Sequence, residues 1–220
     1  TDSFGRDLLS RVLVGARSTI LLALLATIIG STVGALIGLI SAYFGGRIDE
    51  IIMRIVDAVM AIPGLLFALL IISALGSSAI NAVIAIGIFN IPVFARVTRG
   101  AALSLWSREY ILAARVAGKG SFLISVQHIL PNLGGLLIVQ AAVQFALAVV
   151  AEAGLSYVGM GVQPPDPSWG RMLSEAQTMI GFAPWLAIFP GLAIMLLVFG
   201  FGLIGDGLND HLDPRIRQAR

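Results

Sequence analysis

The sequence predicts an all-α fold, a polytopic membrane helix bundle, and three observations support this prediction. Of the 220 residues, 58% are hydrophobic and only 12% are charged, with a mean hydropathy of +0.96. Soluble domains carry about 25% charged residues, so this chain has too few charges to cover a surface in water. Its uncharged stretches are long enough to cross a hydrocarbon core of about 30 Å. The high hydrophobicity also excludes a disordered chain.

Uncharged stretches place five membrane spans along the chain, because a charge at the bilayer centre costs about 2.5–3.5 kcal/mol. The first stretch, Ser18 to Gly46, is long enough to cross with some tilt. The second, Ala58 to Ala95, is too long for one pass, and Gly76 to Ser78 divides it into two. The predicted spans are residues 19–44, 55–75, 79–96, 133–152 and 184–205.

The basic residues orient these spans with Thr1 outside, because Lys and Arg concentrate in cytoplasmic loops. This arrangement places ten basic residues inside, namely Arg47, Arg54, Arg96, Arg99, Arg108, Arg115, Lys119, Arg215, Arg217 and Arg220. Four lie outside, namely Arg6, Arg11, Arg17 and Arg171. An external N-terminus without a signal peptide needs an upstream segment for export, so we expect a further helix before Thr1.

We expect residues 1–220 to form a single transmembrane domain, since the sequence contains no internal repeat and no low-complexity tract. Two segments outside the membrane are long enough to have a function, an inner loop of residues 97–132 and an outer loop of residues 153–183. The sequence contains no cysteine, which excludes disulfides, a thiol nucleophile and cysteine-ligated metals.

The inner loop is predicted to contain two short helices. Ser107 is a suitable N-cap for a helix over 108–117, and Glu109 favours the dipole of its first turn. Gly118 can adopt the left-handed conformation that ends a helix, and a second helix is expected over 121–131. The small side chains on the first helix would allow another protein to approach closely. From the residues alone, this helix is either a docking helix or an ordinary surface helix.

Residues 112–118 and 128–131, Leu-Ala-Ala-Arg-Val-Ala-Gly and His-Ile-Leu-Pro, resemble the EAA loop of permease subunits in binding-protein-dependent ABC importers. Further blocks resemble the C-type permease of the dipeptide/oligopeptide/nickel branch, and these are residues 1–7, 43–49, 53–54, 128–132, 164–170 and 205–215. The chain departs from the EAA consensus at Leu112, where the consensus has glutamate, and at His128, where it has isoleucine.

The resemblance implies a type I ABC importer permease fold, with a sixth helix at the N-terminus. It implies a second permease subunit, two cytoplasmic ATPases that bind the EAA loops, and an extracytoplasmic binding protein, all at the bacterial plasma membrane. ATP and Mg²⁺ would bind the ATPases, so no cofactor, no enzymatic activity and no nucleic acid partner are expected for this chain. The coupling residues that it implies are Glu109, Leu112, Ala113, Ala114, Arg115, Gly118, Leu130 and Pro131.

Two groups of residues in the membrane domain suggest structural roles. Gly30, Gly34 and Gly38 form one small-residue face, which favours close helix packing over a role in the pathway. Arg54 and Asp57 lie three residues apart and are predicted to pair with each other or to contact the ATPase.

Arg96 and Arg99 are expected to anchor at the inner headgroups. Glu152 is an acidic residue at the outer end of an otherwise uncharged span, which makes it a candidate for the translocation pathway. The alternative is a carboxylate that is hydrogen-bonded to the turn at residues 154–156.

In the outer loop, Ser168 is predicted to cap a helix over 169–180. Trp169 and Trp185 suit the aromatic belt at the membrane surface. This segment would either support an outer gate or docked binding protein, or simply cover the bundle.

A metal site is not expected, because His128 and His211 lack further ligands at suitable spacing. Asp206, Asp210 and Asp213 do not fit a calcium loop and are expected to cap and solvate the C-terminal end.

An intramembrane enzyme would need a convergent catalytic set, which the spans lack. An ion channel stays open as an alternative, and the transported solute is a peptide, a nickel chelate or another small molecule.

Overall fold

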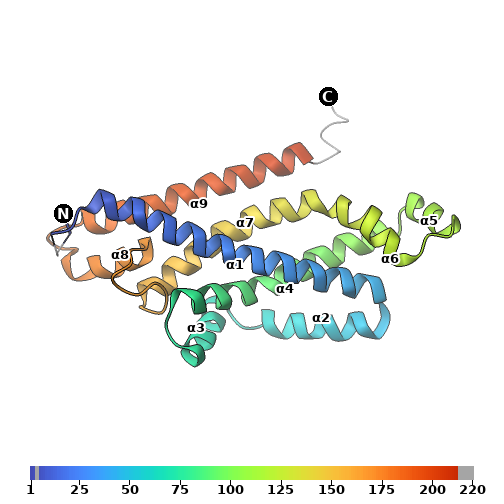
Figure 1. Ribbon diagram of the computed structural model, residues 1–220, viewed down its shortest axis with the longest axis horizontal. Coiled ribbons are helices and arrows are strands. Elements are labelled where there is room, and N and C mark those ends of the chain that lie inside the picture. Colours follow the sequence, from blue (N-terminus) through green and yellow to red (C-terminus); the bar gives the residue numbers. More distant parts are fainter. Residues whose placement is uncertain (3–4, 213–220) are drawn as a thin grey trace.

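The computed structural model describes residues 1–2 and 5–212, which form an elongated bundle of helices (Figure 1). Predictions for Asp213, Arg215, Arg217 and Arg220 lie outside the described residues, as do Ser3 and Phe4 of the first resembling block. The helices are α1 (Leu8–Phe44), α2 (Gly46–Met60), α3 (Gly64–Leu75), α4 (Ala79–Trp106), α5 (Glu109–Val116), α6 (Ser121–Ile124), α7 (Leu130–Tyr157), α8 (Trp169–Ala176) and α9 (Trp185–Leu212). A π-helical turn, Ser125–Ile129, joins α6 to α7, and a 3₁₀ turn, Gln177–Met179, follows α8.

Four of the described helices are long and apolar enough to cross a membrane. They are α1, α4, the continuous helix Ser121–Tyr157 and α9. The helices α2 and α3 pass the same test only together, as a span bent by 89°. Five crossings are therefore confirmed only if this bent pair counts as one. The second span, predicted over residues 55–75, is broken at residues 61–63 in the structure, because Pro63 lacks an N–H and disfavours a helical residue before it.

The long helices extend beyond the predicted spans. At the start of α1, Asp7 accepts a hydrogen bond from the Ser10 backbone N–H at 2.7 Å and therefore caps the helix well before Thr19. Hydrogen bonds from Ser10, chiefly from its hydroxyl, lower the pKa of Asp7. The helix α4 continues to Trp106 and α7 continues to Tyr157, which shortens both predicted loops.

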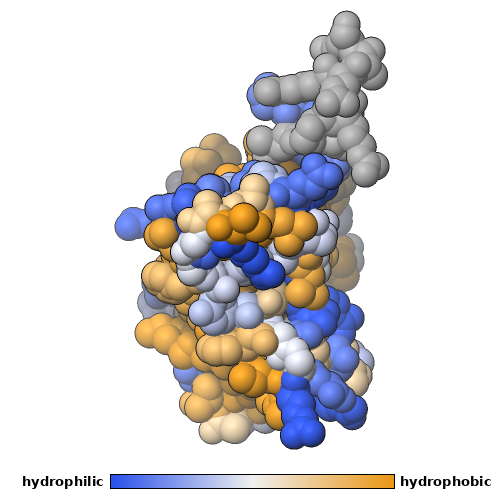
Figure 2. All heavy atoms as spheres, turned by 90° about the vertical axis from the view of Figure 1, so that its right-hand side faces the viewer, coloured by the Kyte–Doolittle hydropathy of each residue, from blue (hydrophilic) through white to orange (hydrophobic). Residues whose placement is uncertain are grey.

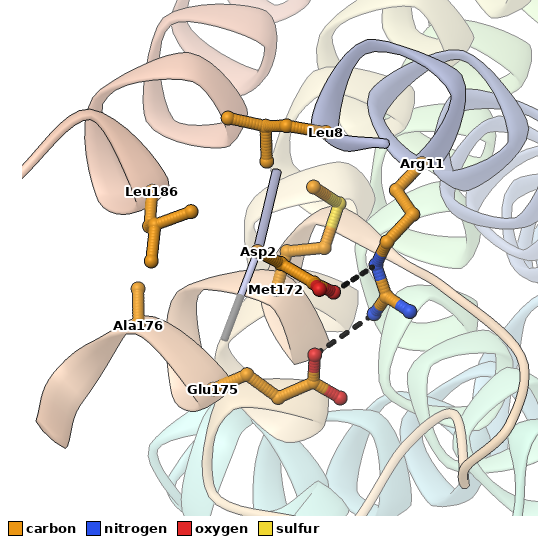
Figure 3. Close-up of a pocket in the computed structure, with 7 residues that line it drawn as sticks. All are labelled: Asp2, Leu8, Arg11, Met172, Glu175, Ala176 and Leu186. Atoms are coloured by element: carbon orange, nitrogen blue, oxygen red, sulfur yellow. Dashed lines mark hydrogen bonds and ion pairs between the residues drawn. The ribbon is translucent and has the colours of Figure 1, made fainter. Parts of the chain in front are cut away.

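The bundle has two distinct ends (Figure 1). The N-terminal segment and α8 lie at one end, called the outer end below, and α5 and α6 lie at the other, called the inner end. At the outer end, Arg11 joins two carboxylates: it pairs with Glu175 of α8 at 2.8 Å and with Asp2 at 3.6 Å (Figure 3). These pairs join the start of α1 to α8 and to the N-terminal segment.

The core of the bundle is the close contact between α1 and α4. Gly30, Gly34 and Gly38 lie on the face of α1 that contacts α4. A Cβ atom at Gly34 would lie 2.5 Å from the Ile91 carbonyl oxygen and 2.6 Å from the Phe94 Cβ. Such distances are far below van der Waals contact, so the packing role predicted for these glycines is confirmed.

We predict that Gly34→Ala destabilises the bundle, because even one methyl group would push α1 away from α4. Overpacking of this kind costs about 1–3 kcal/mol. Gly100→Ala is the matched control, since a Cβ at Gly100 meets no described atom within 4 Å. Thermal unfolding of the purified protein in detergent measures both. A Gly34→Ala protein as stable as the Gly100→Ala protein would contradict the packing described here.

Candidate coupling surface and buried polar cluster

The short helix α5 is attached to the inner end of the bundle chiefly by its buried side chain, Ile111. Ile111 is fully buried. It belongs to a cluster with Ala42 of α1, Ala102 of α4, and Ile124, Ile129 and Leu133. Because this cluster joins three long helices, a displacement of α5 would be transmitted to all of them.

The turn after α5 has the predicted left-handed glycine. Gly118 has a φ of +81°. The Gly118 N–H donates to the Arg115 carbonyl at 2.9 Å, and the Lys119 N–H donates to the Ala114 carbonyl at 3.1 Å. The predicted N-cap is wrong: Ser107 ends α4, where its hydroxyl donates to the Ser104 carbonyl, and Arg108 occupies the N-cap position without a side-chain hydrogen bond.

Two polar contacts that the sequence does not predict hold this segment in place. The Arg115 guanidinium lies 4.7 Å from the centre of the Trp106 ring, a cation–π contact. The Lys119 ammonium lies 3.1 Å from both Gln127 Oε1 and His128 Nε2. Residue spacing gives no signal for either contact, because each depends on the turn that connects the helices.

The opposite face of α5 is exposed. Val116 is 91% exposed, and Phe122 on the following helix is 71% exposed. Seven of the eight predicted coupling residues are exposed, and Ala114 is half-buried against the bundle. Figure 2, which views the molecule from this end, shows hydrophobic side chains interspersed with hydrophilic ones. A surface that combines apolar and polar side chains, on a helix anchored to the bundle through Ile111, is suited to contact another protein.

Glu152 lies in a buried polar cluster between α1, α7 and α8. Its side chain is fully buried, and its Oε1 accepts a hydrogen bond from the Ser156 hydroxyl at 2.6 Å. The hydroxyls of Thr19 and Ser168 also approach the carboxyl group, although Oε2 has no hydrogen-bond partner among the described residues. This geometry matches the alternative in which Glu152 bonds to the turn at residues 154–156.

The three hydroxyls around Glu152 also accept hydrogen bonds from the backbone of the outer segment. Ser156 accepts from Val162 at 3.0 Å, Thr19 from Trp169 at 3.3 Å, and Ser168 from Arg171 at 3.2 Å. Each hydroxyl therefore keeps its own hydrogen available for the carboxylate. Glu152 thus attaches the outer segment to the bundle, and a substrate would reach it only if α8 moved away from α1 and α7.

The outer helix is confirmed with two differences. Ser168 caps it as predicted, but α8 ends at Ala176 and only the 3₁₀ turn continues to Met179. Trp169 is buried, and its indole N–H donates to the Val12 carbonyl at 2.9 Å, so it does not belong to a surface belt. Trp185 is 48% exposed. Trp169 instead connects α8 to α1.

The ion pairs of α2 differ from the predicted one. Arg54 pairs with Glu50 at 2.6 Å instead of with Asp57, and Asp57 pairs with Arg96 of α4. Arg99 pairs with Asp49, which also accepts from the Ser41 hydroxyl. Arg96 and Arg99 therefore connect α2 to α4, and their role at the inner headgroups stays a prediction.

The remaining predicted polar positions and the cavity of Figure 3 do not form a ligand site. The described residues include no cluster of three or more His, Asp or Glu residues that could hold a metal. Asp206 and Asp210 lie within α9, before its end, so neither caps it. The cavity in Figure 3, lined by Arg11 and Glu175 among others, has a volume of about 20 Å³, enough for about one water molecule.

A family model described as "Binding-protein-dependent transport system inner membrane component" matches residues 34–218. The chain belongs to this family. The resemblance identified in the sequence is thereby confirmed, and the permease is a multi-pass membrane protein of an ABC transport system.

Similar curated proteins are permeases of peptide transport systems. The dipeptide transport system permease protein DppC of Alkalihalophilus pseudofirmus is 44% identical over 99% of this chain and 71% of its own length. The di/tripeptide transport system permease protein DppC of Pseudomonas aeruginosa is 43% identical over 100% and 72%. The glutathione transport system permease protein GsiD of Pectobacterium atrosepticum is 42% identical over 98% and 72%.

Among solved structures, the permease resembles a chain of the inward-facing MetNI methionine ABC transporter. The TM-score is 0.76, and the match covers 93% of this chain and 97% of that chain at 17% identity. At this identity the likeness establishes only the fold, which is the type I importer permease fold expected from the sequence.

We predict that Glu152→Gln lowers the stability of the permease by about 1–3 kcal/mol, because the amide places an N–H donor in a buried cluster whose three hydroxyls already accept from backbone N–H groups. Peptide uptake would then fall by the same factor for neutral and charged substrates. Asp166→Asn is the control, since Asp166 is an exposed carboxylate of the same outer segment. Thermal unfolding and uptake measure the two effects. A selective loss of cationic substrates at unchanged stability would contradict the attaching role and support a position in the pathway.

Proposed function

We propose that this permease is one transmembrane subunit of an ATP-driven importer that moves short peptides across the bacterial plasma membrane by alternating access. The observation that carries the proposal is the 42–44% identity, over nearly the whole chain, to permeases named for dipeptides, di/tripeptides and glutathione. These compounds are all short, hydrophilic peptides that carry both an ammonium group and carboxylates. A nickel chelate or another small solute is the alternative substrate.

We further propose that the exposed face of α5 is the coupling surface for one of two cytoplasmic ATPases, which would bind ATP and Mg²⁺ and carry out hydrolysis. Its exposed residues Glu109, Leu112 and Ala113 would contact the ATPase directly. Arg115 and Gly118 would hold the segment in shape through the Trp106 contact and the left-handed turn. The burial of Ile111 supports this assignment, because it would turn ATPase closure into a movement of the whole bundle.

At the outer end, the segment containing α8 would support a docked extracytoplasmic binding protein or an outer gate. Its attachment to α1 and α7 through Glu152, Trp169 and Arg11 supports this role, because a docking surface must keep its shape. A second permease subunit would complete the pathway. Cross-linking from position 166 to the binding protein tests the docking proposal.

We predict that vesicles containing this permease and its partner subunits take up a labelled dipeptide only with ATP and the binding protein. Ala113→Arg should abolish uptake, since a long charged side chain on the exposed face of α5 would prevent close contact with the ATPase. Ala113→Ser, which keeps the small size, should retain uptake. Uptake of the labelled peptide and co-purification of the ATPase provide the two readouts.

Several results would overturn this proposal. Uptake of a nickel chelate without uptake of any peptide would show that the transported substrate is the chelate and not a peptide. Ion conductance without ATPase partners would indicate a channel. Unchanged transport in the Ala113→Arg protein would remove α5 from the coupling surface.

A further inference from the structure

The helix α2 has an exposed charged face, unlike the long apolar helices beside it. Arg47, Glu50, Arg54 and Asp57 follow one another at spacings of three and four residues, so they share one face of the helix. The side chains of Arg54, Glu50 and Asp57 are 77%, 60% and 61% exposed. On the side that faces α1 and α4, Val56 is buried. Unlike Arg99 and Asp49, the charges of this face remain open to the surroundings.

This helix reaches the middle of the bundle. Its residues Val56 and Val59 line an apolar groove together with Ile88, Ile91 and Pro92 of α4, among others. Gly64, directly after the break, packs against the Phe89 ring. The contact is so close that a Cβ atom at Gly64 would overlap the ring. Phe89 is ten residues into α4, about 15 Å from its outer end. The break between α2 and α3 therefore lies deep within the membrane.

The break also leaves backbone groups without partners. The carbonyls of Met60, Ala61 and Ile62 accept no backbone hydrogen bond from the described residues. Ala61, the residue that caps the end of α2, is exposed and lies four residues after Asp57, so it continues the charged face. Nonhelical backbone at membrane depth is tolerated only where it is buried in protein or lines a water-filled cavity. Charged side chains within spans likewise face the interior of the bundle or a water-filled cavity.

We propose that the charged face of α2, defined as Arg47, Glu50, Arg54, Asp57 and Ala61, lines the aqueous route by which the substrate crosses the membrane. The proposal rests on the proposed transport function and identifies the surface of this chain that the substrate passes. Cations and anions alternate along this face, as they do in a zwitterionic peptide, whose ammonium and carboxylate would both find counter-charges. The free carbonyls at the break add acceptors for an ammonium group.

Cysteine accessibility tests the proposal, because the chain has no native cysteine. Single variants Arg54→Cys and Ala61→Cys would sit on the charged face, whereas Ile51→Cys and Ile55→Cys would sit on the exposed apolar stripe of the same helix. The assembled transporter in membrane vesicles is treated with a membrane-impermeant methanethiosulfonate. We expect the first pair to react more than about tenfold faster, since an apolar environment raises the thiol pKa and suppresses the reactive thiolate.

Equal, slow labelling of all four positions would overturn the proposal, because it would mean that the charged face is covered by a dry protein interface. Ala61→Cys keeps the test valid if loss of the Arg54 charge prevents assembly. Dipeptide uptake by vesicles with the unmodified chain is measured in parallel. Uptake with slow labelling contradicts only the route, whereas fast labelling at the charged face without uptake contradicts only the transport function.

Discussion

The structure depends on one constraint: a charge or an unpaired backbone group cannot face the hydrocarbon of a membrane. Arg99 satisfies this constraint by pairing with Asp49, and Arg11 by pairing with Glu175. Glu152 satisfies it by burial among three hydroxyls, each of which is held by a backbone N–H. The charged face of α2 and the break that follows it leave exposed polar groups in place, and this exception indicates where water enters the bundle.

The two ends of the molecule are fixed to the same central contact. The glycine face of α1 allows it to lie directly against α4. At the inner end, Ile111 attaches α5 to these helices, and at the outer end Trp169 attaches α8 to α1. Because both attachments lead to α1 and α4, a movement that begins at α5 can reach the outer end without deforming a long loop. This arrangement suits alternating access driven by a separate ATPase.

The sequence predicted the elements that depend on local patterns. The uncharged stretches located the spans, the spacing of Gly30, Gly34 and Gly38 predicted close packing, and Gly118 and Ser168 marked helix ends.

The partners of Arg96 and Arg99 could not be predicted, because Asp57 and Asp49 are 39 and 50 residues away in the sequence. The predicted spans are also shorter than the helices, because each charge was assumed to lie outside the membrane. Pro63 was a visible signal for the broken span, but an uncharged stretch alone does not distinguish a straight helix from a bent pair. These distant ion pairs connect α2 to α4.

Water is expected to reach the break between α2 and α3 at mid-membrane depth. Hydrogen–deuterium exchange of the assembled transporter in a lipid bilayer measures this directly. We expect fast exchange at the backbone amides of Gly64, Leu65 and Leu66, while the amides around Phe89, at the same depth on α4, stay protected. Equal and strong protection at both positions would show that the break is dry and would contradict an aqueous route along α2.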